Sequence, residues 1–160
     1  MTMMDTDDRL DPLMVVVRGL TAHESRTLGR YIPRHDLQRA VLHIGSVPWY
    51  LPQSFAAIAR GKDIYFRPGI FVEGTPSCLA LLGHELIHVG QYRAGMNAFR
   101  YLTSCAGGYG NSRYEVPAYA MQSRILGDLC AQRPTRIPAE IRRTEQGGAQ
   151  SSAVDFTPGA

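Results

Sequence analysis

A helical repeat of apolar residues dominates the chain between residues 75 and 95. Leucine and valine recur there at three- and four-residue steps, on one face of a helix: Leu79, Leu82, Leu86 and Val89. Thr75 is a suitable N-cap, and Pro76 fits the first helical position, where its missing N–H costs nothing. Gly95 is typical of the residue that ends a helix. The pattern therefore predicts one long helix between Thr75 and Gly95.

Shorter patterns before this helix predict strands and two weaker helices. The run Val41–Ile44 is rich in β-branched residues and short enough for a strand. The runs Phe55–Ile58 and Ile64–Arg67 flank a polar turn and predict a β-hairpin. Weak helical periodicity covers Ser25–Tyr31 and Arg34–Ala40. The sheet is therefore expected to come from residues that precede the long helix.

Two further helices are expected after the long one. Asn97 can cap a short helix that runs through Cys105, and the glycine-rich stretch 107–110 is typical of a loop. Another helix is predicted from Glu115 to Cys130, with Pro117 in its first turn. The patterns together predict a small α+β fold, in which a short sheet or hairpin packs on the long helix and a second helix follows.

Length and composition favour a single domain with two dissimilar ends. A chain of 160 residues, 44% of them hydrophobic, can bury a core without the help of disulfides or metal. Residues 1–12 are acidic. Residues 146–160 contain glycine, glutamine, serine and proline and show no apolar periodicity. We therefore expect one domain over residues 13–145, a mobile N-terminal segment and a disordered C-terminal tail.

Composition also argues against several classes of protein. The three cysteines lack a C-x-x-C spacing and are expected to be reduced thiols: Cys78, Cys105 and Cys130. A net charge of +3 with scattered basic residues disfavours a nucleic-acid partner. No run of about 18 apolar residues is present, which disfavours a membrane span. The acidic start lacks a secretion signal, so we expect a cytoplasmic protein, or one exported without a cleavable signal peptide.

The long helix carries the motif H-E-x-x-H at residues 84–88. Four residues advance a helix by about 6 Å and slightly more than one turn, so His84 and His88 lie on one face and can share a metal ion. Glu85 is then beside that ion. Two histidines at this spacing, with an acid next to the first, are typical of a catalytic zinc site.

A catalytic zinc ion usually takes a third protein ligand and leaves the fourth position to water. No histidine follows His88, and Ala94 occupies the position where the metzincin pattern has its third histidine. Among the downstream acids, Glu115 heads a helix reached through a glycine-bearing loop, and Asp128 is the reserve candidate. The remaining histidines are expected at the surface or in satisfied strand positions: His23, His35 and His43.

Such a site predicts a zinc-dependent peptidase with one Zn²⁺ per chain. Zinc lowers the pKa of a bound water to about 7 and polarises a carbonyl, while Glu85 takes the proton of that water. A donor is needed for the developing charge on the carbonyl oxygen, and three tyrosines near the motif are candidates. They are Tyr92, Tyr109 and Tyr114.

The chain from about Val41 to Gln122 resembles the zinc metallopeptidase domain found in contractile-injection-system and polymorphic-toxin proteins. The resemblance is carried by DIYFRPGIFVEGTPSCLALLGHELIHVGQYRAG and, after it, by AFRYL, GGYG and YEVPAY. It implies a small gluzincin-like member of the zincins, with a peptide or protein substrate and a toxin or injection-system context. In that group the resemblance implies His84 and His88 as zinc ligands, Glu85 as general base and Glu115 as third ligand.

The resemblance also implies a role for the strand before the motif and shows one departure. In zincins a strand that borders the cleft pairs with the substrate, and this role falls on Ile64–Arg67, for which an interior strand is the alternative. Gluzincins often have an aspartate four residues after the third ligand, where this chain has Tyr119. Two alternatives therefore accompany the peptidase hypothesis. One is a zincin-like binding or structural module with an idle metal, and the other is a latent peptidase covered by its own tail after Glu145.

Overall fold

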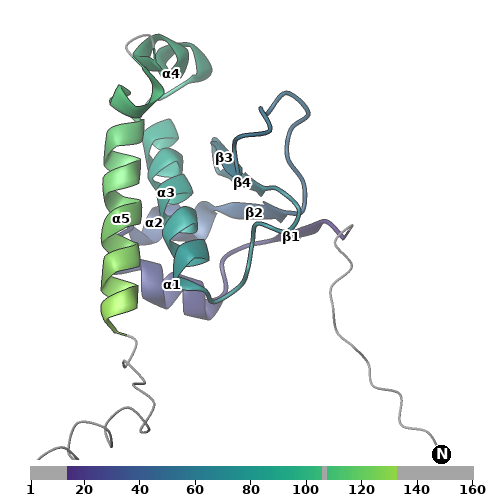
Figure 1. Ribbon diagram of the computed structural model, residues 1–160, viewed down its shortest axis with the longest axis vertical. Coiled ribbons are helices and arrows are strands. Elements are labelled where there is room, and N and C mark those ends of the chain that lie inside the picture. The colour runs from purple at the N-terminus through teal and green to yellow at the C-terminus, as the bar shows by residue number, and fades with distance from the viewer. Residues whose placement is uncertain (1–13, 106–107, 133–160) are drawn as a thin grey trace, which may run out of the picture.

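The computed structural model describes residues 14–105 and 108–132 (Figure 1). This part of the chain forms a four-stranded mixed sheet and five α-helices, which confirms the predicted α+β class. The expected mobile segment 1–12, the expected tail 146–160 and part of the predicted loop at 107–110 lie outside the described residues. None of the described helices is long and apolar enough to cross a bilayer.

The sheet consists of β1 (Val16–Arg18), β2 (Val41–Ile44), β3 (Ala57–Arg60) and β4 (Asp63–Phe66). Its order is β1-β2-β4-β3, in which β2 and β4 are parallel and the two outer pairs are antiparallel. The predicted strand at β2 and the predicted hairpin of β3 and β4 are confirmed, although β3 begins two residues later than expected. The two-residue connection at 61–62 fixes the hairpin register.

Two features of the sheet differ from the expectations. Strand β1 pairs with β2, but the sequence pattern predicted no strand at residues 16–18. The expected substrate strand, Ile64–Arg67, corresponds to β4, which lies inside the sheet between β2 and β3. Both of its edges are therefore hydrogen-bonded to neighbouring strands, and the assignment of substrate pairing to this strand is wrong. The edge beside the motif helix belongs to β3 instead.

The helices are α1 (Ala22–Leu28), α2 (Arg34–Arg39), α3 (Pro76–Arg93), α4 (Ala98–Ser104) and α5 (Glu115–Ala131). The last four agree closely with the sequence pattern, whereas α1 begins and ends three residues before the expected helix. A short 3₁₀ helix covers Tyr109–Asn111, where the sequence predicted a loop. Thr75 caps α3 by accepting a hydrogen bond from the Cys78 N–H. Gly95 follows the helix with φ of 99°, a conformation that glycine adopts without strain.

Helix α3 lies between the sheet and α5, which runs beside it (Figure 1). Alternate strand residues face α3 because strand side chains point to opposite faces in turn: Leu42, Ala57, Ala59, Ile64 and Phe66. A methyl group on Gly83 of α3 would overlap the Cδ1 atom of Ile125 on α5, so glycine allows the two helices to approach closely. The core thus fixes α3 and α5 as neighbours, which positions the functional site.

Candidate metal centre

His84 and His88 lie one helical turn apart on α3, and both are buried. Their rings are 4.9 Å apart between centroids and nearly perpendicular, and their Nε2 atoms are 3.2 Å apart. The predicted convergence of the two imidazoles is therefore present, because residues at i and i+4 share one helix face. The predicted apolar face of this helix packs against the sheet. The two histidines lie on another side of the helix, toward α5 and the cleft.

Glu115, the first residue of α5, joins the two histidines and is fully buried. Its Oε1 atom is 3.3 Å from Nε2 of His88, and its Oε2 atom is 3.4 Å from Nε2 of His84. The buried Ser112 begins the turn that leads into α5, since its carbonyl oxygen accepts the N–H of Glu115. The structure thus brings Glu115 to the place that the sequence argument required, although the two segments are 27 residues apart.

The three side chains fit a divalent metal ion by the spacing of their donor atoms. A tetrahedral zinc with bonds of about 2.0–2.1 Å holds neighbouring donor atoms about 3.4 Å apart. The two imidazole Nε2 atoms are 3.2 Å apart, and each lies 3.3–3.4 Å from a different oxygen of Glu115, so one donor atom from each residue lies within 4.8 Å of the others. No other cluster of three such donors occurs within residues 14–105 and 108–132. The donor set of two imidazoles and one carboxylate is one that catalytic zinc uses.

Buried atoms without a hydrogen-bond partner also mark the cluster. Three side-chain atoms in the described part of the chain are in this condition, and all belong to the site: His84 Nδ1, Glu85 Oε2 and Glu115 Oε2. A buried polar atom without a partner costs free energy, of the order of 1–3 kcal/mol. A cation beside Glu115 would compensate its charge, and the buried Oε2 of Glu85 would gain a partner from a water or a substrate in the cleft.

Burial and charge divide the two carboxyl groups into different roles. Burial raises the pKa of Glu85 above its usual value, and the nearby histidines only partly oppose this effect. Burial also disfavours ionised Glu115, but the close imidazoles of His84 and His88 and the hydrogen bond from Tyr101 outweigh this effect and hold the pKa well below the usual range. Glu115 is therefore suited to bind a cation, and Glu85 is suited to exchange a proton.

Sequence reasoning missed two residues that support the site. The Tyr101 hydroxyl of α4 donates to Oε1 of Glu115 at 2.7 Å. Gln91, one turn after His88 on α3, bonds to Nδ1 of His88 at 2.8 Å and to the Tyr114 carbonyl oxygen at 2.9 Å. The spacing of three residues from His88 could have suggested Gln91. Nothing in the local pattern points to Tyr101, because α4 reaches the site only through tertiary packing.

The cluster lies in the wall of a cleft with a volume of about 520 Å³. Strand β3 and the loop before it form one side, while α3 and the region of α4 form the other. The cleft is lined mainly by apolar and aromatic side chains, among them Leu51, Phe55, Ile58, Tyr92 and Met96. Glu85, His84, His88 and Glu115 supply nearly all of its acidic and imidazole groups. The site therefore combines a polar centre with mostly apolar walls.

The structure separates the candidate tyrosines. Tyr92 lines the cleft, and burial raises the pKa of its hydroxyl. Tyr114 does not line the cleft, and its hydroxyl accepts a hydrogen bond from Arg113. The side chain of Tyr109 lies outside the described residues. Tyr101, which was not considered, does line the cleft.

The other sequence candidates near the site also have definite positions. Asp128 lies near the far end of α5, where its Oδ2 accepts from the Tyr31 hydroxyl, so it is not part of the cluster. Tyr119, the residue at the position of the gluzincin aspartate, packs its ring against His84 with 4.7 Å between centroids. In gluzincins an aspartate at this position often orients a histidine. Here the ring of Tyr119 packs against His84 instead.

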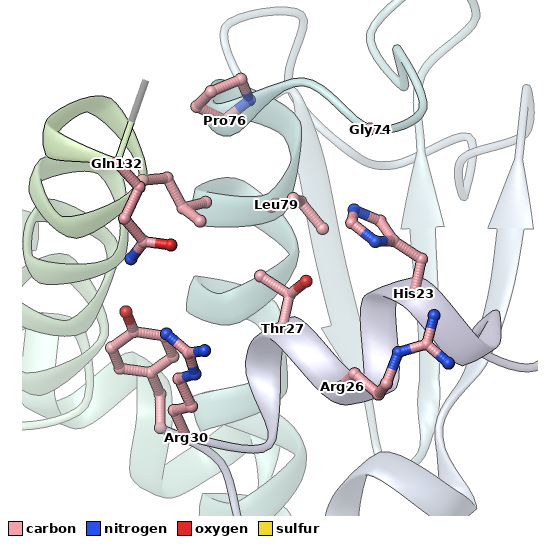
Figure 2. Close-up of a pocket in the computed structure, with 10 residues that line it drawn as sticks. His23, Arg26, Thr27, Arg30, Gly74, Pro76, Leu79 and Gln132 are labelled. Carbon is pink, nitrogen blue, oxygen red and sulfur yellow. The ribbon is translucent and has the colours of Figure 1, made fainter. Parts of the chain in front are cut away.

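A second cavity lies at the other end of α3. Figure 2 shows it between α1, the first turn of α3 and the end of α5. Its volume is about 420 Å³, and its charged lining comes from His23, Arg26 and Arg30. None of the residues in the metal cluster lines it. The predicted metal ligands and the predicted general base therefore line the first cleft and not this cavity.

The fold and the site define a small α+β domain with a candidate divalent-metal centre between two packed helices. The family model of the eCIS core domain, the core domain of extracellular contractile injection systems, matches residues 33–96. This match supports an injection-system context. It includes His84, Glu85 and His88 and ends before Glu115. Comparisons with curated proteins and with solved structures found no match.

Proposed function

We propose that this protein is a zinc-dependent peptidase. The observation that carries the proposal is the cluster of donor atoms from His84, His88 and Glu115, which lines the same cleft as Glu85, whose buried Oε2 has no hydrogen-bond partner. The donor spacing fits zinc, and a neighbouring carboxyl group with a raised pKa fits a general base. A purely structural zinc site would have four protein ligands and no need for the acid or the cleft.

The chemistry follows from the positions of the side chains. Zinc, when bound, supplies a water of lowered pKa and polarises the carbonyl of the scissile bond. Glu85 removes a proton from the attacking water, and the water oxygen adds to the carbonyl carbon. Glu85 then returns the proton to the amide nitrogen as the C–N bond breaks. Tyr92, in the cleft lining, is the hydroxyl donor available for the carbonyl oxygen, because the Tyr101 hydroxyl already donates to Glu115.

The cleft suggests how a polypeptide would bind. Strand β3 is the outermost strand on this side of the sheet, and Ala57–Arg60 lines the cleft beside the cluster. A substrate in extended conformation can pair with such an edge through its backbone. The apolar walls would then receive its side chains. We therefore place substrate pairing on β3 and propose a peptide or protein as the substrate, which is in keeping with the injection-system context.

Replacing Glu85 by glutamine tests this function directly. Glu85→Gln removes the base and leaves the three ligands, so zinc content should stay near one ion per chain while cleavage falls about 10²–10⁴-fold. Zinc is measured by elemental mass spectrometry, and cleavage of unfolded proteins and peptide libraries is followed by mass spectrometry. The matched control is Glu73→Gln, which changes an exposed acid outside the cleft. Equal cleavage by the two variants, or a wild-type protein without zinc, would contradict the proposal.

A binding module is the second candidate, and one observation favours it. Two large apolar residues adjoin the cleft lining in sequence and are highly exposed, namely Trp49 at 94% and Phe99 at 75%. Exposed aromatic side chains are typical of surfaces that bind other proteins. Peptides that bind the wild-type protein tightly, survive incubation uncut and bind equally well after chelation would support this candidate over the peptidase.

A further inference from the structure

The side chain of Gln91 contacts both a histidine of the motif and the backbone at the head of α5. Its Nε2 atom is 2.9 Å from the Tyr114 carbonyl oxygen, and its Oε1 atom is 2.8 Å from Nδ1 of His88. Tyr114 immediately precedes Glu115. A single amide group thus touches α3 and the residue next to the proposed third ligand.

The hydrogen-bond directions at Gln91 follow from the chemistry of its partners. A backbone carbonyl can only accept, so the atom that faces the Tyr114 oxygen must be the amide nitrogen. The amide oxygen then faces His88, and because this oxygen can only accept, Nδ1 of His88 must carry a proton. A neutral His88 therefore has its lone pair on Nε2, the atom that points at the cluster.

We propose that Gln91 is a positioning residue for the metal centre. It holds His88 in the tautomer that offers Nε2 to a cation, and it ties the head of α5 to α3 so that Glu115 meets the same cation. The inference rests on the metal site of the proposed function but not on the peptidase activity. It is specific to glutamine, because glutamate lacks the donor for the carbonyl and an apolar side chain lacks both groups.

The other motif histidine provides an internal contrast. Nδ1 of His84 is buried and has no hydrogen-bond partner among the described residues, and the His84 ring is packed against Tyr119. Ligating histidines in metal sites usually donate their second N–H to a partner that fixes the ring, and loss of that partner costs about 10–100-fold in metal affinity. In this site the protein makes such a bond to His88 alone, so the effect should be concentrated at Gln91.

Metal affinity measured on two Gln91 variants tests the proposal. Gln91→Met keeps the length of the side chain and removes both hydrogen bonds, and its zinc affinity should fall about 10–100-fold. Gln91→Glu keeps an acceptor for His88 and should recover part of that loss. Zinc dissociation constants come from competition with a chromogenic chelator, and Co²⁺ absorption spectra report the coordination geometry. The matched control is Gln38→Met on α2, an exposed glutamine remote from the cleft.

The outcomes separate a positioning role from a structural one. A structural role alone would lower the melting temperature of the metal-free variants while the folded protein kept its zinc affinity, and that result would overturn the proposal. So would a Gln91→Met protein that binds zinc as tightly as the Gln38→Met control.

Nitrogen-15 NMR of the zinc-loaded wild type needs no variant, and it should show a proton on Nδ1 of His88 and metal on Nε2. The reverse arrangement would refute the assignment. Normal zinc binding without any peptide cleavage would reject the peptidase and leave the role of Gln91 intact.

Discussion

Three glutamates of the described residues are buried, and two of them, Glu24 and Glu115, have surroundings that differ in one respect. Glu24 is 1% exposed, and each of its carboxylate oxygens accepts a hydrogen bond from the Arg18 guanidinium at 2.8 Å. The N–H of Thr21 adds a third bond at 2.7 Å. Glu115 is 0% exposed and has the Tyr101 hydroxyl and two imidazoles around it, while its Oε2 lacks a hydrogen bond. The protein by itself neutralises the first carboxylate and leaves the second incomplete.

The comparison shows that a shifted pKa alone does not identify a functional acid. Burial by itself would raise the pKa of both groups, but their polar and charged partners lower it by more, so both end below the usual value. The partner is a permanent cation at Glu24 and a pair of titratable rings at Glu115. Only the second arrangement leaves room for an added ion. Geometry therefore distinguishes a structural ion pair from a candidate metal site where the pKa shifts do not.

The largest expected effect is stabilisation by zinc that depends on Glu115 and not on Glu24. A ligand at 1,000 times its dissociation constant adds about 4 kcal/mol to the free energy of unfolding. Glu115→Gln should lose most of this increment because it removes a ligand, whereas Glu24→Gln should retain it. Urea unfolding of chelator-stripped and zinc-loaded proteins gives the increments. Equal increments in the two variants would show that Glu115 is not a ligand.

The next largest effect is expected from a substitution that breaks the ion pair between Arg18 and Glu24 and leaves the surroundings of Glu115 unchanged. Arg18→Met should lower the free energy of unfolding by about 3 kcal/mol at pH 7, since it strands a buried carboxylate, and zinc should not alter the loss. Arg18 lowers the pKa of Glu24 from its ordinary value of 4.5. The pair's contribution is therefore present above about pH 4.5 and disappears as the pH falls through the lowered value.

Stability measured from about pH 7 to about pH 3 checks the sign of this effect. The difference between wild type and Arg18→Met should shrink as the solution becomes more acidic. Arg39→Met is the control because it removes an exposed arginine of α2. A difference that stays constant over this range, or that grows toward acid pH, would show that Arg18 acts through packing and not through the charge of Glu24.

The smallest effect is expected from a substitution in the contact between α3 and α5, which positions Glu115 but not Glu24. Gly83→Ala should cost about 1–3 kcal/mol, because its methyl group overlaps the Cδ1 atom of the fully buried Ile125, whose side chain must then shift within the packed contact between α3 and α5. Zinc affinity should fall as well, while the Arg18–Glu24 pair is unaffected. Gly127→Ala on α5 meets open space and should be neutral or stabilising by up to about 1 kcal/mol. Unchanged zinc affinity in Gly83→Ala would show that the site tolerates a wider helix spacing.

Local chemistry explains which parts of the fold could be predicted. The capped helix α3 and the hairpin of β3 and β4 follow from residues close together in the chain, and both were predicted. Strand β1 has three residues and exists because β2 pairs with it, so its own run gave too little signal. The same reason explains the error at β4, since strand order depends on which partners a strand finds and not on its sequence alone.

The sequence by itself determined the chemistry of the centre: two imidazoles one turn apart, an acid beside them, and a further acid at the start of a later helix. These follow from helix periodicity and capping, which act over a few residues. Only the tertiary structure decided that Glu115 meets His84 and His88, that Tyr101 and Gln91 support them, and that β3 forms the edge of the cleft. The physical reason is that these contacts depend on how closely α3 and α5 pack at Gly83 and on the order of the strands. Both are properties of the whole core that no short segment encodes.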